Sequence, residues 1–293
     1  MTDLAIARTP PRHSSTLVRI MSRKPWAFAA GIVLATIAAS AILAPILAPH
    51  DPLTLAPSLR LRPPSETYPL GTDAYGRDLL SRVLYGSRIS LAVGIGAATL
   101  STALGLLLGL LAGFFRPLDA TLMRMADGLM AIPAILLAVA VVSLSGASLA
   151  SVLIAITLPE IPRVMRLVRS VVLLAREQPY VEAAVSLGTR TPRLLRKHIL
   201  PNTIAPVIVQ ASFICASAIL TESALSFLGA GISPTTPTWG NIMADGRTFF
   251  QLRPSLIFWP GLFLAVTVLS INIIGDAARD LLDPRMKQRE TGL

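Results

Sequence analysis

Six stretches of this chain contain no Asp, Glu, Lys or Arg, and each is long enough to cross a bilayer as a helix. A membrane-spanning helix needs about 20 mostly apolar residues. Soluble domains carry roughly 25% charged residues, whereas this chain of 293 residues has 14%. The sequence therefore predicts an all-α integral membrane protein. The uncharged stretches are 25–50, 89–115, 128–159, 198–221, 223–244 and 254–275.

These stretches are best divided into six spans. Serines and a glycine between residues 143 and 148 interrupt the longest stretch, where a short hairpin is able to turn. The stretch 223–244 is excluded because prolines and glycines separate its short apolar pieces, so we interpret it as an extracytoplasmic loop. We expect transmembrane helices over about 26–48, 89–115, 129–145, 148–164, 203–224 and 257–275.

Orientation is predicted from the positions of the Lys and Arg residues. With the N-terminus inside, the inner segments hold 19 of the 26 cations and the outer segments hold 7. Cytoplasmic loops are enriched in Lys and Arg, so both termini are predicted to be cytoplasmic. The division that follows is a cytoplasmic tail over 1–24, a first helix with an extracytoplasmic segment over 25–88, a membrane core over 89–284 and a second cytoplasmic tail over 285–293.

The basic character of the chain, with a net charge of +10, does not indicate a nucleic-acid partner. Its cations flank apolar runs instead of forming one patch, so topology explains them. Cys215 is the only cysteine, and the three histidines are far apart in the sequence. No metal site and no arrangement for catalysis is recognisable. The chain has no G-x-x-x-x-G-K-[ST] phosphate-binding loop either, so any ATP must be bound by another polypeptide.

The longest predicted inner loop, 165–202, has the pattern of two short helices. The first, over 180–187, should end at Gly188, since glycine tolerates the left-handed backbone of a helix C-terminus. The second should begin with Thr191 as N-cap and Pro192 at the first position, and Pro201 should end it. Such an amphipathic pair is suited to docking in a groove of a partner protein. The alternative is an interfacial helix on anionic lipid headgroups.

The same loop resembles the E-A-A-x3-G motif of ABC importer permeases. The motif residues are Glu182, Ala183, Ala184 and Gly188, followed by Leu200 and Pro201. In that family the loop forms the coupling helix that contacts a separate ATPase, so the resemblance implies that role for these six residues. One departure is His198, where the general pattern has isoleucine; the apolar residue stands at Ile199 instead.

Other stretches are similar to the second permease subunit of dipeptide, oligopeptide and nickel importers. They are L-G-T-D-A-Y-G-R-D at 70–78, E-S-A-L-S-F-L-G at 222–229 and N-I-I-G-D at 272–276. The resemblance covers about residues 20–285. It implies a type-1 permease fold in a bacterial inner membrane. The implied partners are a homologous permease in a heterodimer, two ATP-binding subunits that carry ATP and Mg²⁺, and an extracytoplasmic solute-binding protein. This chain would need no cofactor and would not be an enzyme.

Two rival functions differ from this interpretation in mechanism. An ion-gradient-driven secondary transporter needs ionisable groups inside the membrane and often shows internal repeats, and no convincing repeat is visible. A non-transporting membrane scaffold is the second rival. Uptake driven by an ion gradient without an ATPase would favour the first, and transport that survives deletion of this chain would favour the second.

Two acids lie within the predicted spans. Intramembrane ionisable groups are functional candidates by default. For Glu160 we favour an ion pair with a nearby arginine, such as Arg163. Glu222 either lines the pathway or outer gate or packs against a sister subunit.

Further charges and a glycine stripe have structural and functional interpretations. Three charged residues, Arg77, Asp78 and Arg82, precede the second span. They form either a solvated face with local salt bridges or a contact surface for a binding protein. Glycines at 105, 109 and 113 lie on one helical stripe, which we interpret as close helix packing.

Overall fold

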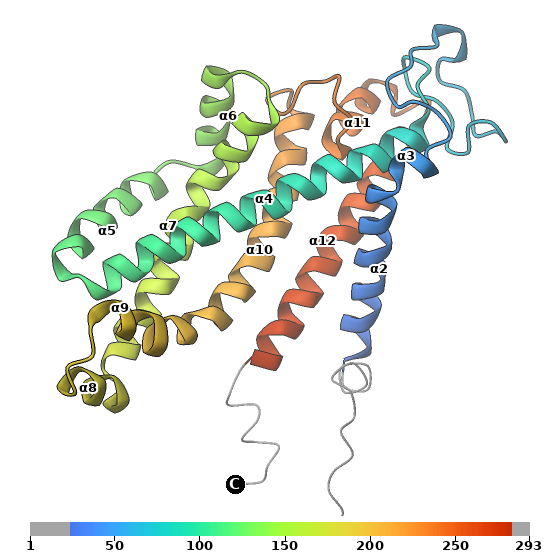
Figure 1. Cartoon of the computed structure of the whole chain (residues 1–293). Helices are drawn as coiled ribbons and strands as arrows, with labels where there is room; N and C mark the ends of the chain where they lie inside the picture. The colour runs from blue at the N-terminus through green and yellow to red at the C-terminus, as the bar shows by residue number, and fades with distance from the viewer. Residues whose placement is uncertain (1–23, 283–293) are drawn as a thin grey trace, which may run out of the picture.

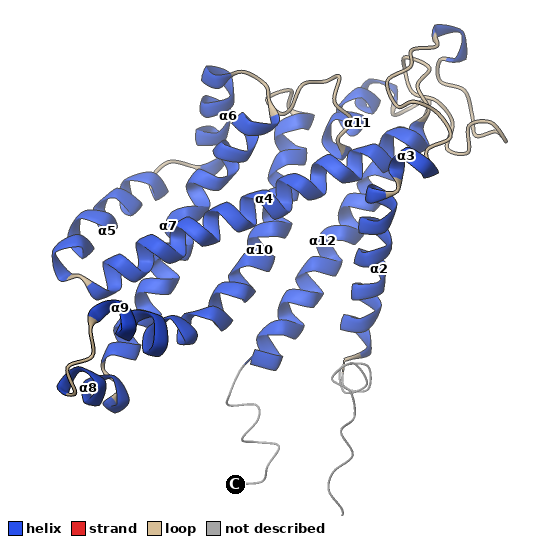
Figure 2. Cartoon of the chain, in the orientation of Figure 1, coloured by secondary structure: helices blue, strands red, loops and turns tan. Residues whose placement is uncertain are grey.

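The computed structural model describes residues 24–282, and this part of the chain is helical with connecting loops and no strand (Figure 2). The predicted terminal tails, apart from Lys24, lie outside the described residues. The helices are α2 (Pro25–Ile42), α3 (Ala44–Leu47), α4 (Leu79–Phe114), α5 (Arg116–Met130), α6 (Ala134–Ser145), α7 (Leu149–Arg176), α8 (Pro179–Ser186), α9 (Thr191–Leu194), α10 (Leu200–Phe227), α11 (Trp239–Gly246) and α12 (Ser255–Leu282), with short 3-10 turns at Pro57–Leu59 and Arg247–Phe249.

The bundle is built from long helices that run between two ends (Figure 1). At one end lie α8, α9, the start of α2 and the end of α12; we call this the α8 end. At the other, the α11 end, lie α11, α3 and the start of α4. An ion pair between Lys24 and Asp280 holds the first turn of α2 against the last turns of α12.

Helix α4 crosses the bundle obliquely and packs tightly along α7 (Figure 1). Its glycine stripe lies against a valine stripe. A methyl group at Gly105 would stand 2.5 Å from Cβ of Val164, and one at Gly109 would stand 2.7 Å from Cβ of Val168. Gly113 is equally close to a valine one turn further along α7. The expected packing role of the stripe is therefore confirmed, with α7 as its partner.

The largest apolar core joins α2, α4, α10, α11 and α12 near the α11 end. Trp239, the first residue of α11, is fully buried in it, and its indole Nε1 donates a hydrogen bond to the carbonyl of Val83 in α4 at 3.3 Å. Burial of a side chain this large contributes strongly to stability. This core fixes α11, which belongs to the loop we excluded as a span, against the start of α4.

The all-helical class is confirmed, whereas the count of six spans stays a prediction. Four helical segments, namely α2, α4, α9 with α10, and α12, are long and apolar enough to cross a membrane. The pair α5 and α6, bent by 86°, brings the number to five if it forms one broken span. Helix α7 misses the criterion because its second half carries arginines. Helix α4 begins at Leu79, so the predicted boundary between residues 88 and 89 falls inside a helix.

Candidate coupling site

The α8 end carries the helix that the sequence singles out, and its termination follows from local chemistry. Gln178 is extended and Pro179 opens α8, a position where proline's missing N–H costs nothing. At the other end Gly188 has φ +74°. Its N–H donates to the carbonyl of Val185 at 2.9 Å, and the N–H of Thr189 donates to that of Ala184 at 3.1 Å. These two bonds form a Schellman motif, so the predicted end at Gly188 is confirmed.

The second helix differs from the prediction in two ways. Thr191 is the first helical residue and makes no capping hydrogen bond; Arg190 precedes it as N-cap. Pro201 does not end the helix, because the chain continues through a π-helical turn over Leu195–Ile199 directly into α10. In that turn the N–H of Leu200 bonds to the carbonyl of Leu195. A wider turn of this kind shifts the hydrogen-bond register, and Pro201 then stands in the first turn of α10, where proline is tolerated.

One face of α8 is fixed to the protein. Val181 and Ala184 form a small buried cluster with Leu194 of α9, and Phe114 at the end of α4 packs against it. Arg176, the last residue of α7, donates to the carbonyls of Gly113 at 3.0 Å and Phe114 at 3.3 Å. These are orphan carbonyls at the C-terminus of α4, where a cation is favourable. Helix α8 is thus clamped to the ends of α4 and α7.

A second contact joins α8 to the start of α10. The amide Nδ2 of Asn202 donates to the hydroxyl of Tyr180 at 3.0 Å and to the carbonyl of His198 at 2.7 Å. His198, the residue that departs from the family pattern, lies in the π-helical turn with its ring 6.3 Å from that of Tyr180. The motif residues Leu200 and Pro201 follow at once in the first turn of α10. Helix α8 is therefore linked to the start of α10 by a direct side-chain hydrogen bond.

The side chains of α8 and its C-cap around the buried stripe of this helix are exposed. Glu182, Ala183, Val185 and Leu187 are exposed, and Leu187 shows 87% of its surface. Glu182 also borders a cavity of about 330 Å³ beside the ends of α4 and α7. Of the two predicted alanines, Ala183 is available to a partner and Ala184 is buried inside the chain. An exposed apolar face next to a carboxylate is suited to docking on another protein.

Helix α5 is tied to α7 by two ion pairs near the α8 end. Arg169 binds Asp119 through two nitrogens, one of them at 2.6 Å, and Arg166 pairs with Asp127. The hydrogen bond from Arg169 lowers the pKa of the Asp119 carboxyl below its ordinary value. The arginines of α7 thus serve packing between helices in this structure.

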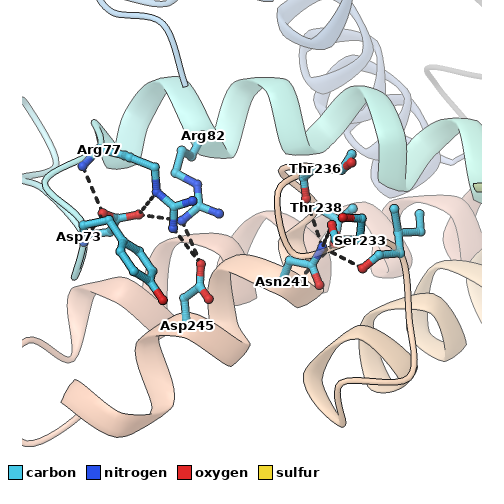
Figure 3. Close-up of polar contacts among 10 residues, drawn as sticks. Asp73, Arg77, Arg82, Ser233, Thr236, Thr238, Asn241 and Asp245 are labelled. Atoms are coloured by element: carbon cyan, nitrogen blue, oxygen red, sulfur yellow. Dashed lines mark hydrogen bonds and ion pairs between the residues drawn. The ribbon is translucent and has the colours of Figure 1, made fainter. Parts of the chain in front are cut away.

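The candidate contact residues at the α11 end are buried, contrary to the exposed surface we expected. The Arg77 side chain is 8% exposed and that of Arg82 is fully buried. Both guanidinium groups bind Asp73 at 2.6 Å, and both reach Asp245 of α11, at 2.8 Å and 3.0 Å (Figure 3). Asp78, also buried, caps α4 by accepting from the backbone N–H of Ser81 at 2.9 Å. The local salt bridges of our first interpretation are therefore present, but the side chains that form them are buried and not solvated in this structure.

Sequence reasoning missed the carboxylates of this cluster and the loop beside it. Asn241 donates to three carbonyls of the loop before α11, those of Ile232, Ser233 and Thr236, at 3.3, 3.1 and 2.9 Å (Figure 3). The amide of one side chain thereby holds the proline-containing loop in one shape. The sequence signal that could have revealed the start of α11 was Thr238, a residue type favoured at helix N-caps. Its hydroxyl accepts a hydrogen bond from the backbone N–H of Asn241 at 3.1 Å.

The two acids within the predicted spans have different surroundings. Glu160 pairs with Arg163 at 2.7 Å, so the favoured ion pair is confirmed. Glu222 is fully buried in α10, and the hydroxyl of Ser226 donates to it at 2.9 Å, with Ser90 of α4 at 3.4 Å. Glu222 thus joins α10 to α4 and lines no open pathway in this structure.

Comparison with known proteins agrees with this architecture. Residues 105–288 match the family described as "Binding-protein-dependent transport system inner membrane component", and residues 16–64 match "N-terminal TM domain of oligopeptide transport permease C". A methionine ABC transporter structure in an inward-facing conformation, MetNI, shares the fold with a TM-score of 0.57 at 19% identity, over 70% of this chain and 98% of that chain.

Three curated relatives align over most of their length. The "Probable peptide ABC transporter permease protein y4tQ" of Sinorhizobium fredii is 47% identical over 99% of both chains. The dipeptide transport system permease protein DppC of Alkalihalophilus pseudofirmus is 42% identical over 87% of this chain and 84% of its own. The glutathione transport system permease protein GsiD of Pectobacterium atrosepticum is 39% identical over 96% and 93%.

A bundle of several helices that are long and apolar enough to cross a membrane defines a multi-pass membrane protein. The family and sequence matches identify the class of membrane protein. The chain belongs to the family of inner membrane components of binding-protein-dependent transport systems, the permease subunits of ABC transporters. In such transporters ATP hydrolysis takes place on separate chains.

Proposed function

We propose that this chain is the permease of an ATP-driven importer for short peptides, with α8 as its coupling helix. The observation that carries this is the two-sided character of α8. Val181 and Ala184 are buried next to Phe114 at the end of α4, whereas Val185 and Leu187, on the two sides of that buried stripe, are exposed. Peptides are the proposed cargo because relatives similar over most of the chain are named as peptide or dipeptide permeases.

The α8 end is proposed to face the cytoplasm. It carries the cations of the predicted inner loop, including Arg190, Arg193 and Lys197, and Lys and Arg favour the cytoplasmic side. The division of the chain into tails, first helix and core follows from this orientation. Reporters fused after Arg60 should then lie outside, and one fused after Arg190 inside. A reporter after Arg190 found outside would overturn the orientation.

The proposed assembly has four kinds of component. This chain would pair with a homologous permease in a heterodimer, and an extracytoplasmic solute-binding protein would deliver the cargo. Two ATP-binding subunits, which hold ATP and Mg²⁺, would dock on the two coupling helices. When these subunits close on ATP, α8 would move with them. Because α8 is clamped to α4 and α7 and contacts α10, its movement would reach three long helices together.

Site-directed cross-linking tests the docking face. In a Cys215→Ala background, Leu187→Cys places a thiol on the exposed face, and Ala184→Cys places one on the buried face as a matched control. We expect cysteine at 187 to cross-link to the ATP-binding subunit in the assembled complex and cysteine at 184 not to do so. Equal yields from the two positions, or cross-links from 187 to lipid alone, would refute docking and favour the interfacial helix.

Transport measurements separate this function from its rivals. Uptake of a radiolabelled dipeptide into proteoliposomes that contain the whole complex should require ATP and the binding protein. Uptake that a proton or sodium gradient supports without ATP would instead identify a secondary transporter. Unchanged uptake in a strain that lacks this chain would identify a scaffold.

A further inference from the structure

A cavity of about 690 Å³ opens between α7, α10 and α12 toward the α8 end, and it has no part in the docking of ATP-binding subunits on α8. Its volume lies within the range of ligand pockets, which are mostly apolar with a few convergent polar groups. Here the apolar wall includes Val209, Phe213 and Leu282, and the polar groups come from Asn202, Gln210 and Arg279.

Gln210 stands out because it is a polar side chain in the middle of an apolar helix. It is half-buried, and its amide makes no hydrogen bond to any other described residue. Such a group in a membrane helix faces a water-filled space or a polar ligand. The side of α10 that carries Gln210 lines the cavity.

Two further polar groups lie in the same cavity. Pro206 has no N–H, so the backbone carbonyl of Asn202, four residues earlier, lacks the donor that an α-helix normally supplies. Arg279 approaches from the last turns of α12, and its guanidinium forms no ion pair among the described residues. The cavity therefore offers one cationic fork, one amide and one carbonyl that lacks its usual helical donor, beside an apolar wall.

We propose that this cavity is a transient cargo site in the half of the pathway near α8, and that it binds a short peptide by its ends and backbone and not by its side chains. Arg279 is suited to the terminal carboxylate, since a guanidinium binds a carboxylate in a fork. The Gln210 amide pairs with a peptide group, and the Asn202 carbonyl accepts from an N–H. Phe213 and Val209 contact side chains without selecting among them. The inference rests on the proposed peptide importer.

The site is directly connected to the coupling helix. Asn202, which lines the cavity, also bonds through its side chain to Tyr180 of α8 at 3.0 Å. Pro201, at the start of α10, lines the cavity as well. A displacement of α8 by an ATP-binding subunit would therefore move part of the cavity wall. Nucleotide state and peptide occupancy would be linked through these two residues.

Thiol labelling tests the site without relying on uptake. In the Cys215→Ala background, Gln210→Cys is compared with Ile208→Cys, a matched control on the same helix that is 46% exposed and does not line the cavity. The whole complex is assayed in inverted membrane vesicles without nucleotide. Small anionic and cationic methanethiosulfonates are the probes, and dialanine and its C-terminal amide are the competitors.

We expect cysteine at 210 to react at least about tenfold faster than cysteine at 208. The anionic probe should be favoured at 210, and Arg279→Gln should reduce that preference by about fivefold, as expected for the loss of one nearby charge in a hydrated site. Dialanine should slow labelling at 210, and its amide should protect less. Slow labelling at 210, no protection by dialanine, or equal protection by its amide would each overturn the inference.

Failure of this inference is distinguishable from failure of the proposed function. ATP-dependent dipeptide uptake is measured separately with the Cys215→Ala protein, which retains Gln210 and Arg279. Uptake that requires ATP, with no protection at position 210, would refute only the cargo site. Uptake without ATP would refute the importer, whatever the labelling shows.

Discussion

Gly188→Val is expected to uncouple ATP hydrolysis from transport while the protein remains in the membrane. Gly188 has φ +74°, in the left-handed region where an L side chain costs about 1–2 kcal/mol. Apart from residues 187 and 189, no atom of the described chain lies within 4 Å of the position that its Cβ would take, so a clash with more distant residues adds no further cost. For a β-branched residue we take the upper figure, about 2 kcal/mol.

This strain acts on the end of α8. A penalty of about 2 kcal/mol shifts the equilibrium between the capped and frayed forms roughly 30-fold. The N–H groups of residue 188 and Thr189 would lose their bonds to Val185 and Ala184 in the frayed form. The exposed face of α8 would no longer have one fixed shape. Peptide taken up per ATP hydrolysed by the reconstituted complex should therefore fall by about tenfold or more.

Gly188→Asn is the matched control, because asparagine enters the left-handed region more readily than other L residues. It should retain most of the coupling, and Gly188→Ala should lie between the two. Wild-type uptake per ATP in the valine variant would refute the reasoning. An asparagine variant as defective as the valine variant would show that a partner excludes any side chain at this position, and that backbone strain is not the cause.

Three other perturbations test packing and charge. Gly109→Val should prevent α4 from approaching α7, since even a Cβ would stand 2.7 Å from the opposite side chain, and membrane yield should fall; Gly128→Val, where no atom lies within 4 Å, should keep a normal yield. Arg82→Met should lower stability by up to about 3 kcal/mol, because it leaves Asp73 and Asp245 to share the single cation of Arg77; adding Asp73→Asn should recover part of the thermal unfolding temperature. The lowered pKa of Asp119 means that its ion pair contributes stability above the unfolded pKa of about 3.9, which is lost as the pH falls through the folded value. Asp119→Asn should remove that part of the acid dependence in thermal unfolding, and an unchanged acid profile would contradict the assignment.

Local features of the fold could be predicted from the sequence more easily than its long-range contacts. The end of α8 was predictable because a glycine in the left-handed region is a property of a few neighbouring residues. The glycine stripe of α4 predicted a close neighbour, but not that α7 would supply it. The end predicted at Pro201 was wrong because a π-helical turn absorbs the proline, and no residue pattern of the loop signals such a turn.

The buried ion cluster could not be predicted for a different reason. Asp73, Arg77 and Arg82 lie close together in the sequence and resemble a hydrophilic segment. Asp245 lies in α11, far away in the sequence, and only the folded chain brings it to the two arginines. The positive-inside rule counts such arginines as exposed loop charges. In the folded chain they are buried instead, next to a carboxylate that is 168 residues from Arg77 and 163 residues from Arg82.

Helix α4 is the element best suited to carry movement across the whole bundle. It has 36 residues, which corresponds to about 54 Å at 1.5 Å per residue, and it contains no proline. The long helices α7, α10 and α12 each contain proline, which weakens the helical hydrogen-bond ladder and favours bending. Arg176 holds the carbonyls at one end of α4, and Arg82 joins its other end to α11. A displacement of α8 would therefore reach the α11 end along one continuous helix, while the proline-containing helices allow the cavity between them to change shape.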